Sequence, residues 1–540
     1  MSLSYIGESL AEFGLILKIK DSGASKVSII IYSFHILNWI MSQIFQWKWE
    51  ILAPLFGVML TLAFAPYDFS YLVLIALIFF YFSCATLPVW RAALMGYLFG
   101  LGLFGFGVWW VYVSIHEFGG ADRLSSGLLV LLFVGLWALF PAITAAIAVK
   151  VLSVFGVFSR ITVFALLWVS VEYFRGYCLL NGFPWLQIAY SQLNTPLAGL
   201  VPVVGVYGVG FILAVSAAIV VEMTRAKLSP LFGVALLSLI WIGGWGLKAV
   251  HWTHPIGHPI TITLVQGNID QRQKWLPNQK LDTLRRYQQL TEQHWNADVI
   301  IWPETSIPAF LSDVKEFFLD PLAQKARDEG ADVVVSLPTD GEGKHYFNSV
   351  MTLGKTEAFY HKSHLLPFGE YLPLQPLSGW ILDQLQIPLG NFSAGGDEQP
   401  LLQAGGYPFV TTICYEDAFG ELVIRQLEQA AYLVNVTNDA WFGNTSEPYQ
   451  HMQMAQMRAL ETGRYMVRAT NTGLTGFILP NGMISKQAPL FTTTTLTDTV
   501  IPMGGLTPYA HLGDKLVFVG LFTLVALITG LEGLVDRRSD

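Results

Sequence analysis

Long apolar runs separated by short polar loops dominate the first half of the chain. A bilayer core about 30 Å thick requires about 20 consecutive apolar residues per helix. Seven runs before residue 250 and one near the C-terminus have this character, so the pattern predicts eight membrane-spanning helices. These cover residues 50–67, 69–88, 92–114, 126–149, 158–176, 197–222, 229–247 and 514–534.

Residues 251–508 follow a different pattern, in which short strand-like apolar runs alternate with polar, amphipathic stretches. This pattern is typical of a water-exposed α/β domain. We therefore divide the chain into an N-terminal extension (1–48), a bundle of seven helices (49–250), the α/β domain (251–508) and a C-terminal helix with a short tail (509–540).

The N-terminal extension is ambiguous. Its apolar stretch Val27–Phe45 is interrupted by polar residues and lacks the cleavage pattern of a secretory signal. Three interpretations have equal weight: an additional span, a helix lying at the membrane interface, or translation that begins at Met41.

Composition and charge argue against a soluble protein, a nucleic-acid-binding protein and a disulfide-rich protein. A hydrophobic content of 53% with only 13% charged residues exceeds what soluble proteins usually show. The net charge of −8 is spread without a basic stripe, which excludes a nucleic-acid partner. The chain has three cysteines, an odd number, so a disulfide framework is not expected.

The basic residues of the short loops predict the orientation. The side of the membrane whose loops hold more lysine and arginine, the richer side, should be cytoplasmic. It carries Arg91, Lys150, Arg160, Arg225, Lys227, Arg537 and Arg538. The opposite side has only Arg123, Arg175 and Lys248. Because the C-terminal helix ends on the richer side, we expect the α/β domain on the extracytoplasmic face.

Three side chains in the α/β domain follow strand-like runs or lie in a loop between them, and their chemistry is complementary. A buried-strand pattern that ends in a carboxylate covers Asp298-Val-Ile-Ile-Trp-Pro-Glu304. A second strand pattern leads to Cys414 and covers Val410-Thr-Thr-Ile-Cys-Tyr-Glu-Asp417. Lys362 lies between them in a segment rich in proline and glycine. We expect Cys414 on a strand-to-helix elbow, where a helix N-terminus favours the nucleophilic thiolate.

Taken alone, each of the three residues has an ordinary structural explanation. A single cysteine at a strand end is more often a small buried residue, and a lone glutamate or lysine is usually a solvated surface charge. Together, a thiol, a carboxylate and an ammonium match a nucleophile, a general base and an oxyanion stabiliser. The two histidines beside Lys362 have no further ligands nearby in the sequence, so no metal is expected.

Several separate motifs occur in the order in which one known family has them. Those of the bundle are Ala63-Phe-Ala-Pro-Tyr67, Trp168 with Glu172 and Arg175-Gly176, and Gly182-Phe-Pro-Trp185. Those of the α/β domain are Val265-Gln-Gly-Asn-Ile269 with Lys274-Trp275, Trp302-Pro-Glu304, His361-Lys362 running on to Pro367-Phe-Gly-Glu370, Cys414-Tyr-Glu416, and Asn438-Asp-Ala-Trp-Phe-Gly443. From about residue 50 onward the chain resembles the apolipoprotein N-acyltransferases, membrane members of the nitrilase superfamily.

The resemblance implies an αββα sandwich with the triad Glu304, Lys362 and Cys414. It implies transfer of an acyl chain from a phospholipid, through a cysteine thioester, to the terminal amine of a diacylglyceryl apolipoprotein. No cofactor is expected. The location that it implies is a bacterial inner membrane, with the catalytic domain facing the periplasm.

The resemblance also indicates supporting residues in the α/β domain, whose roles stay open. Glu370 supports the lysine or the oxyanion site, or it is a surface charge. Tyr415 and Glu416 shape the pocket of the nucleophile, or Glu416 is only an acid in an early helical turn. Trp275 packs against acyl chains, or it is a buried core residue.

Glu172, Arg175 and Trp185 are candidates for a lipid access region in the membrane. Charged residues are costly in lipid unless they are paired or hydrated. Glu172 and Arg175 therefore fit a buried structural pair as well as a lipid pathway.

Two other functions compete with acyl transfer to lipoproteins. A membrane-tethered amidase or nitrilase would use the same triad, but seven preceding spans argue against it. A transporter or sensor would need polar residues along its spans, whereas apart from Glu172 the spans are almost uncharged.

Overall fold

The computed structural model describes residues 46–341, 345–373 and 392–539. Almost all of the N-terminal extension, including Val27–Phe45 and Met41, lies outside the described residues. Residues Ala53–Asp540 form one compact unit.

A helix coincides with each of the eight predicted spans. These helices are α3 (Lys48–Thr61), α4 (Leu72–Cys84), α5 (Val89–Gly107), α7 (Arg123–Val154), α8 (Val157–Tyr177), α9 (Val201–Thr224), α10 (Pro230–Leu247) and α17 (Pro508–Ser539). Among the described residues, six are long and apolar enough to cross a membrane. The other two, α3 and α4, have 14 and 13 residues and are shorter than predicted.

The first apolar run is longer than its helix for a local reason. α3 ends at Thr61, and the run continues through Ala63–Tyr67 as a turn. Pro66 in this turn has no N–H to donate to a further helical turn. Apolar content therefore overstates the length of the helix here.

The surface of the bundle is apolar in the way that lipid contact requires. Large aliphatic side chains of α7, α10 and α17 are more than half exposed; they include Leu124, Leu131, Leu132, Leu231, Leu239, Leu527 and Leu531. In water such a surface would be a strong liability for aggregation. The chain is a membrane protein.

The α/β domain contains two six-stranded sheets. The first has the order β13 (Thr494–Val500), β2 (Ile260–Gln266), β3 (Val299–Ile301), β4 (Asp332–Asp340), β5 (Tyr346–Leu353) and β6 (Ala358–His361). The second has the order β12 (Ile484–Gln487), β11 (Gly476–Ile478), β10 (Met466–Thr470), β9 (Tyr432–Thr437), β8 (Tyr407–Ile413) and β7 (Leu402–Ala404). The first and last strands of the domain, β1 (His254–Pro255) and β14 (Met503–Gly504), form a separate short antiparallel pair.

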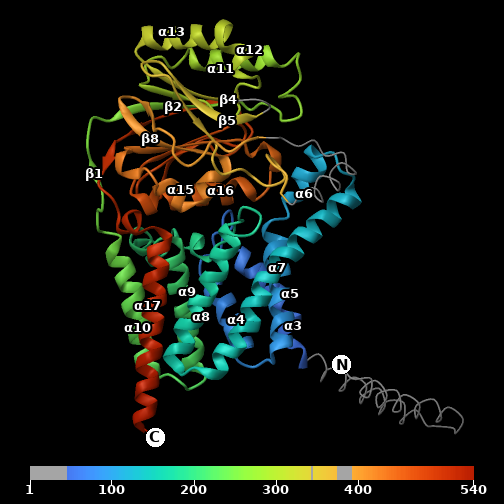
Figure 1. The fold of residues 1–540 in the computed structure, drawn as a ribbon, viewed down its shortest axis with the longest axis vertical. Helices are drawn as coiled ribbons and strands as arrows, with labels where there is room; N and C mark the ends of the chain where they lie inside the picture. The colour runs from blue at the N-terminus through green and yellow to red at the C-terminus, as the bar shows by residue number, and fades with distance from the viewer. Residues whose placement is uncertain (1–45, 342–344, 374–391, 540) are drawn as a thin grey trace, which may run out of the picture. The chain divides into compact units, whose positions relative to one another are not determined.

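The two sheets pack face to face and helices cover their outer faces (Figure 1). α11 (Lys280–Thr291), α12 (Leu311–Val314) and α13 (Asp320–Glu329) cover the first sheet. α15 (Gly420–Ile424) and α16 (Glu447–Thr462) cover the second sheet, on the side of the helical bundle. The αββα sandwich expected from the resemblance is confirmed.

The core between the sheets explains why the central strands are apolar on both sides. Ile262 and Leu264 of β2 and Val334 of β4 pack against Val434 and Val436 of β9, and all five are fully buried. A parallel strand that is covered on both faces reads as a continuous apolar run rather than an alternating one. This burial fixes the strands, and with them the positions of the strand ends.

Candidate active site

The three residues of the expected triad each follow the end of a strand. Glu304 lies in the turn after β3, Lys362 directly follows β6, and Cys414 directly follows β8. β3 is parallel to β4, and two antiparallel steps through β5 make β6 run the same way as β4. The carboxyl ends of β3 and β6 therefore lie at one edge of the first sheet, and this edge meets the Cys414 end of the second.

Glu304 is a buried carboxylate with fixed neighbours. One carboxylate oxygen accepts a hydrogen bond of 2.8 Å from the Asn348 amide on β5, and the Glu304 carbonyl accepts one of 3.3 Å from Lys274. Burial raises the pKa of Glu304, and Glu370 adds to this effect while Lys362 opposes it. A carboxylate with a raised pKa is a stronger base, which suits a general base.

Lys362 forms a buried ion pair with Glu370. Its Nζ lies 3.0 Å from Oε1 and 2.9 Å from Oε2 of that carboxylate. Burial acts to lower the pKa of the Lys362 ammonium, but the neighbouring acidic groups, Glu370 first and then Cys414 and Glu304, outweigh it and raise the pKa. Lys362 is thus a permanent cation, and Glu370 is its partner rather than a surface charge.

Cys414 starts the short 3-10 helix η6 (Cys414–Ala418) and adopts a left-handed backbone conformation, with φ of 52°. Burial, followed by the charge of Glu304, raises the pKa of the Cys414 thiol to about 12, although Lys362 lowers it. The expectation that a helix N-terminus favours the thiolate at rest is therefore wrong. One short helical turn does not offset the desolvation of the sulfur and its neighbouring carboxylate, so the site favours the thiol over the thiolate.

Glu416 connects the loop of Lys362 to the elbow of Cys414. Its carboxylate accepts hydrogen bonds from the backbone N–H groups of Ser363, His364 and Ile413 at 2.7, 3.0 and 2.8 Å. The residue is fully buried. Glu416 is therefore more than an acid in an early helical turn, because its hydrogen bonds join the loop that follows Lys362 to the strand end before Cys414.

Tyr415 contacts the membrane bundle. Its hydroxyl donates a 2.7 Å hydrogen bond to the carbonyl of Gly182, in the loop after α8. In the same loop, the Asn181 amide donates to the carbonyl of Leu365, and the Asn181 carbonyl lies 2.8 Å from Nε2 of His364. The loop after α8 therefore contacts both the residue that follows Cys414 and the loop that follows Lys362.

The two tryptophans singled out in the sequence have opposite environments. Trp275 is 46% exposed, so the alternative of a buried core residue does not apply. Trp185 is 3% exposed and its Nε1 donates a 2.7 Å hydrogen bond to Gln450 of α16. The geometry gives Trp185 a supporting role between the bundle and the α/β domain.

Glu172 and Arg175 are buried at the same end of α8. The Glu172 carboxylate accepts a hydrogen bond from the backbone N–H of Ile188, and Arg175 donates to the carbonyls of Phe183 and Trp185 at 2.8 and 2.6 Å. Both also line a small cavity whose other walls are mostly apolar, formed by Leu60, Leu103, Phe104, Phe140, Pro141, Thr144, Trp168, Val171, Leu186 and Ile188. Arg175 thus shapes the loop that carries Trp185.

Two further polar residues lie next to Glu304: sequence reasoning missed Asn348, and it gave Lys274 only as part of a family motif, without a role. Asn348 donates to both Glu304 and Glu370, at 2.8 and 3.1 Å. Lys274 is 2% exposed, and burial lowers its pKa to about 8 although Glu304 acts to raise it. An asparagine inside the apolar strand Tyr346–Leu353 is the signal that could have identified Asn348, because a buried amide needs partners.

Comparison with known proteins shows two family matches that together span most of the chain. Residues 56–219 match the apolipoprotein N-acyltransferase N-terminal domain, and residues 261–507 match the carbon-nitrogen hydrolases. The chain is 46% identical to an apolipoprotein N-acyltransferase of Methylococcus capsulatus, over 91% of this chain and 96% of that one. It is 43% identical to one of Nitrosomonas europaea, over 82% and 89%. Among solved structures, Saccharomyces cerevisiae Nit3 of the nitrilase superfamily is similar at 15% identity and a TM-score of 0.35, over 46% and 92% of the two chains.

Proposed function

The chain belongs to the apolipoprotein N-acyltransferase family, and from this premise we propose that its Glu304, Lys362 and Cys414 transfer an acyl chain from a membrane phospholipid to the lipoprotein amine. The observation that supports this most directly is the meeting of the three side chains at strand ends, where Lys362 acts on the pKa of both Glu304 and Cys414, and Glu304 acts on the pKa of both Lys362 and Cys414. A thiol, a buried base and a permanent cation are the parts that acyl transfer through a thioester requires.

The first half-reaction forms the thioester. Glu304 takes the proton of the Cys414 thiol as the sulfur attacks the ester carbonyl of the phospholipid. The Lys362 ammonium stabilises the oxyanion of the tetrahedral intermediate. When the C–O bond breaks, the alcohol oxygen receives the proton from Glu304 and a lysophospholipid leaves.

The second half-reaction consumes the thioester. The amine of the lipoprotein attacks the thioester carbonyl, and Glu304 takes a proton from the amine. The C–S bond breaks, the amide is released, and the sulfur recovers a proton from Glu304. Because the first product leaves before the second substrate reacts, the kinetics are ping-pong.

We expect purified protein incubated with phospholipid labelled in its acyl chains to carry the label on Cys414. Mass spectrometry of the peptides would locate the label, and a lipopeptide with a free amine should remove it. Cys178, the exposed cysteine, is an internal control that should stay unlabelled. If the protein instead hydrolyses small amides and forms no phospholipid-dependent thioester, it is the tethered amidase or nitrilase considered above.

The proposal also places the α/β domain on the periplasmic side of an inner membrane. Glu329 at the end of α13 is exposed, so in a Cys178→Ser background a Glu329→Cys variant should react with an impermeant maleimide in intact spheroplasts. Ser153→Cys, at the opposite predicted side, is the matched control and should react only after permeabilisation. The reverse labelling pattern would place the domain in the cytoplasm, away from lipoprotein amines.

A further inference from the structure

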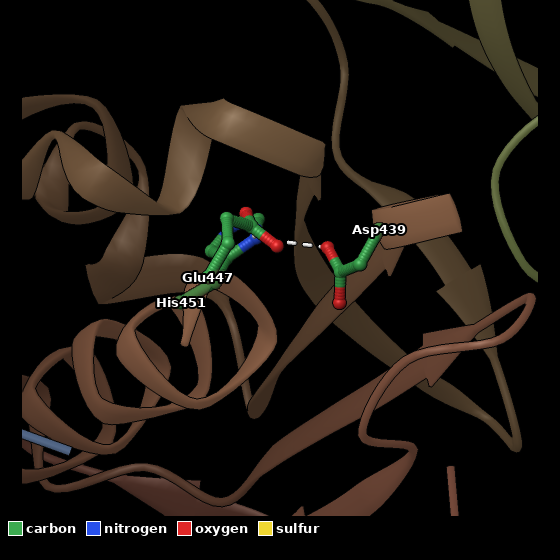
Figure 2. A group of neighbouring side chains, drawn as sticks. All are labelled: Asp439, Glu447 and His451. Atoms are coloured by element: carbon green, nitrogen blue, oxygen red, sulfur yellow. Dashed lines mark hydrogen bonds and ion pairs between the residues drawn. The ribbon is translucent and has the colours of Figure 1, made fainter. Parts of the chain in front are cut away.

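A buried network of charged side chains lies behind Cys414 and is separate from the triad. It consists of Asp417 on η6, Asp439 on the short helix η8 (Asp439–Phe442), Glu447 and His451 on α16, and Arg468 on β10. None of the five is more than 2% exposed. Figure 2 shows that Glu447 and His451 extend from α16 toward Asp439.

His451 lies between two carboxylates. Its Nδ1 is 3.1 Å from Oδ1 of Asp439, and its Nε2 is 2.9 Å from Oδ1 of Asp417. An ionised carboxylate only accepts hydrogen bonds, so only a ring that carries a proton on each nitrogen can donate to both, and the two contacts favour an imidazolium. Burial and the cation of Arg468 act to lower the pKa of His451, but the two carboxylates outweigh them and raise it well above its ordinary value.

The same contacts disfavour a metal ion at Asp439, Glu447 and His451. Ligand atoms of Asp439, Glu447 and His451 lie within 4.8 Å of one another. A metal would need a free lone pair on the imidazole, and both nitrogens donate here. Arg468 also pairs with the carboxylates of Asp417 and Asp439, at 3.1 and 3.2 Å, so the two carboxylates that flank His451 already have a second cation. The third carboxyl group, that of Glu447, lies 3.5 Å from Nδ1 of His451, and burial and the charge of Asp439 raise its pKa to about 7.

The network holds the backbone of Cys414 from two sides. Arg468 donates a 2.6 Å hydrogen bond to the Asn435 side chain, whose amide in turn donates to the carbonyl of Cys414 at 3.2 Å. On the other side, Asp417 belongs to the helix that Cys414 begins. A residue other than glycine at a φ of 52° is in a rarely populated conformation that its surroundings must maintain.

α16 connects the network to the membrane bundle. Gln450, next to His451, accepts hydrogen bonds from the indoles of Trp110 and Trp185 at 3.1 and 2.7 Å. It also donates to the carbonyl of Gly107 at the end of α5. His451 is therefore fixed to the bundle on one side and to the Cys414 elbow on the other.

We propose that His451 is a positioning residue of the acyl transfer: as an imidazolium bound to Asp417 and Asp439, it fixes the elbow of Cys414 and places a positive charge that stabilises the thiolate. The proposal rests on Cys414 being the nucleophile. The charge of His451 acts to lower the pKa of the thiol, as does Lys362, whereas Glu304 and Asp439 act to raise it.

The test uses two neutral variants that each keep one hydrogen bond. In His451→Gln the amide can replace Nε2 and still donate to Asp417, and in His451→Asn it can replace Nδ1 and donate to Asp439. Arg468 still pairs with both carboxylates, so we expect both variants to fold. At each pH from about 6 to about 10, which lies below the thiol pKa of about 12, alkylation of Cys414 by iodoacetamide should be about tenfold slower than in the wild type, because less of the sulfur is thiolate. Acylation by phospholipid at neutral pH should be about tenfold slower.

The matched control is His294→Gln, because His294 bonds Thr495 on the first sheet and has no contact with the network. Its alkylation profile should equal that of the wild type. An unchanged profile in the folded His451 variants would overturn the positioning role, even if wild-type Cys414 forms a thioester. Failure of wild-type Cys414 to form a thioester would instead overturn the proposed nucleophile, and the two failures can be told apart.

Discussion

Cys414→Ser should lose acyl transfer by at least about a thousandfold while the protein still inserts and folds. The thiol already has its pKa raised to about 12 by burial and by Glu304. A serine hydroxyl is a far weaker acid, so the carboxylate cannot activate it at neutral pH. The measurement is the rate of transfer from phospholipid to a lipopeptide amine, with size-exclusion chromatography in detergent as the check on folding.

Cys84→Ser and Cys178→Ser are the matched controls. Cys84 is buried within α4, and Cys178 is exposed at the end of α8. Both variants should form the thioester as the wild type does. Near-normal turnover in Cys414→Ser, or a lost thioester in a folded control variant, would mean that the nucleophile has been misplaced.

Glu304→Gln should slow formation of the acyl-enzyme by about a hundredfold or more. The amide oxygen of glutamine can still accept the hydrogen bond from Asn348, so the site keeps its shape. It cannot take the proton of the thiol, and this step is the one that the raised pKa of Glu304 favours. Single-turnover labelling of Cys414 by phospholipid is the direct measurement.

The pH dependence gives a second measurement for the same residue. Glu304 works as a base only when it is ionised, so the wild-type rate should fall as the pH drops through the raised pKa of Glu304. Glu329→Gln, on the exposed end of α13, should behave as the wild type. If Glu304→Gln acylates at the wild-type rate with the same acid limb, Glu304 is not the base.

The membrane bundle has a direct structural role in the proposed active site. The loop after α8 supplies Asn181 and Gly182 to the segments of His364 and Tyr415. Trp185 of the same loop holds α16 through Gln450. A domain released from its bundle would lose these contacts, so we regard the bundle as part of the scaffold of the site as well as its anchor.

Local pattern was enough to predict the apolar helices and the water-exposed α/β domain of this protein, whereas the αββα arrangement of that domain came from the family resemblance. Each of the eight apolar runs contains a helix, and within the described residues six of these helices are long enough to cross a membrane, because lipid-facing helices need long uninterrupted apolar segments. The strand-like runs before Glu304 and Cys414 became β3 and β8, because strands buried on both faces are continuously apolar. Proximity of Glu304 and Cys414 could also be expected from their strand ends, whereas Lys362 was predicted in a loop and only the structure shows that it directly follows strand β6.

Tertiary structure alone decided what surrounds these residues. The protonation of Cys414 depends on burial and on Glu304, and neither effect can be read from a cysteine at a strand end. The imidazolium of His451 depends on Asp417 and Asp439, which come from different elements. Desolvation and charge pairing act over a few ångströms in space, whereas sequence periodicity reports only neighbours along one element. For this reason the sequence indicated which groups could react, and packing determined their charge.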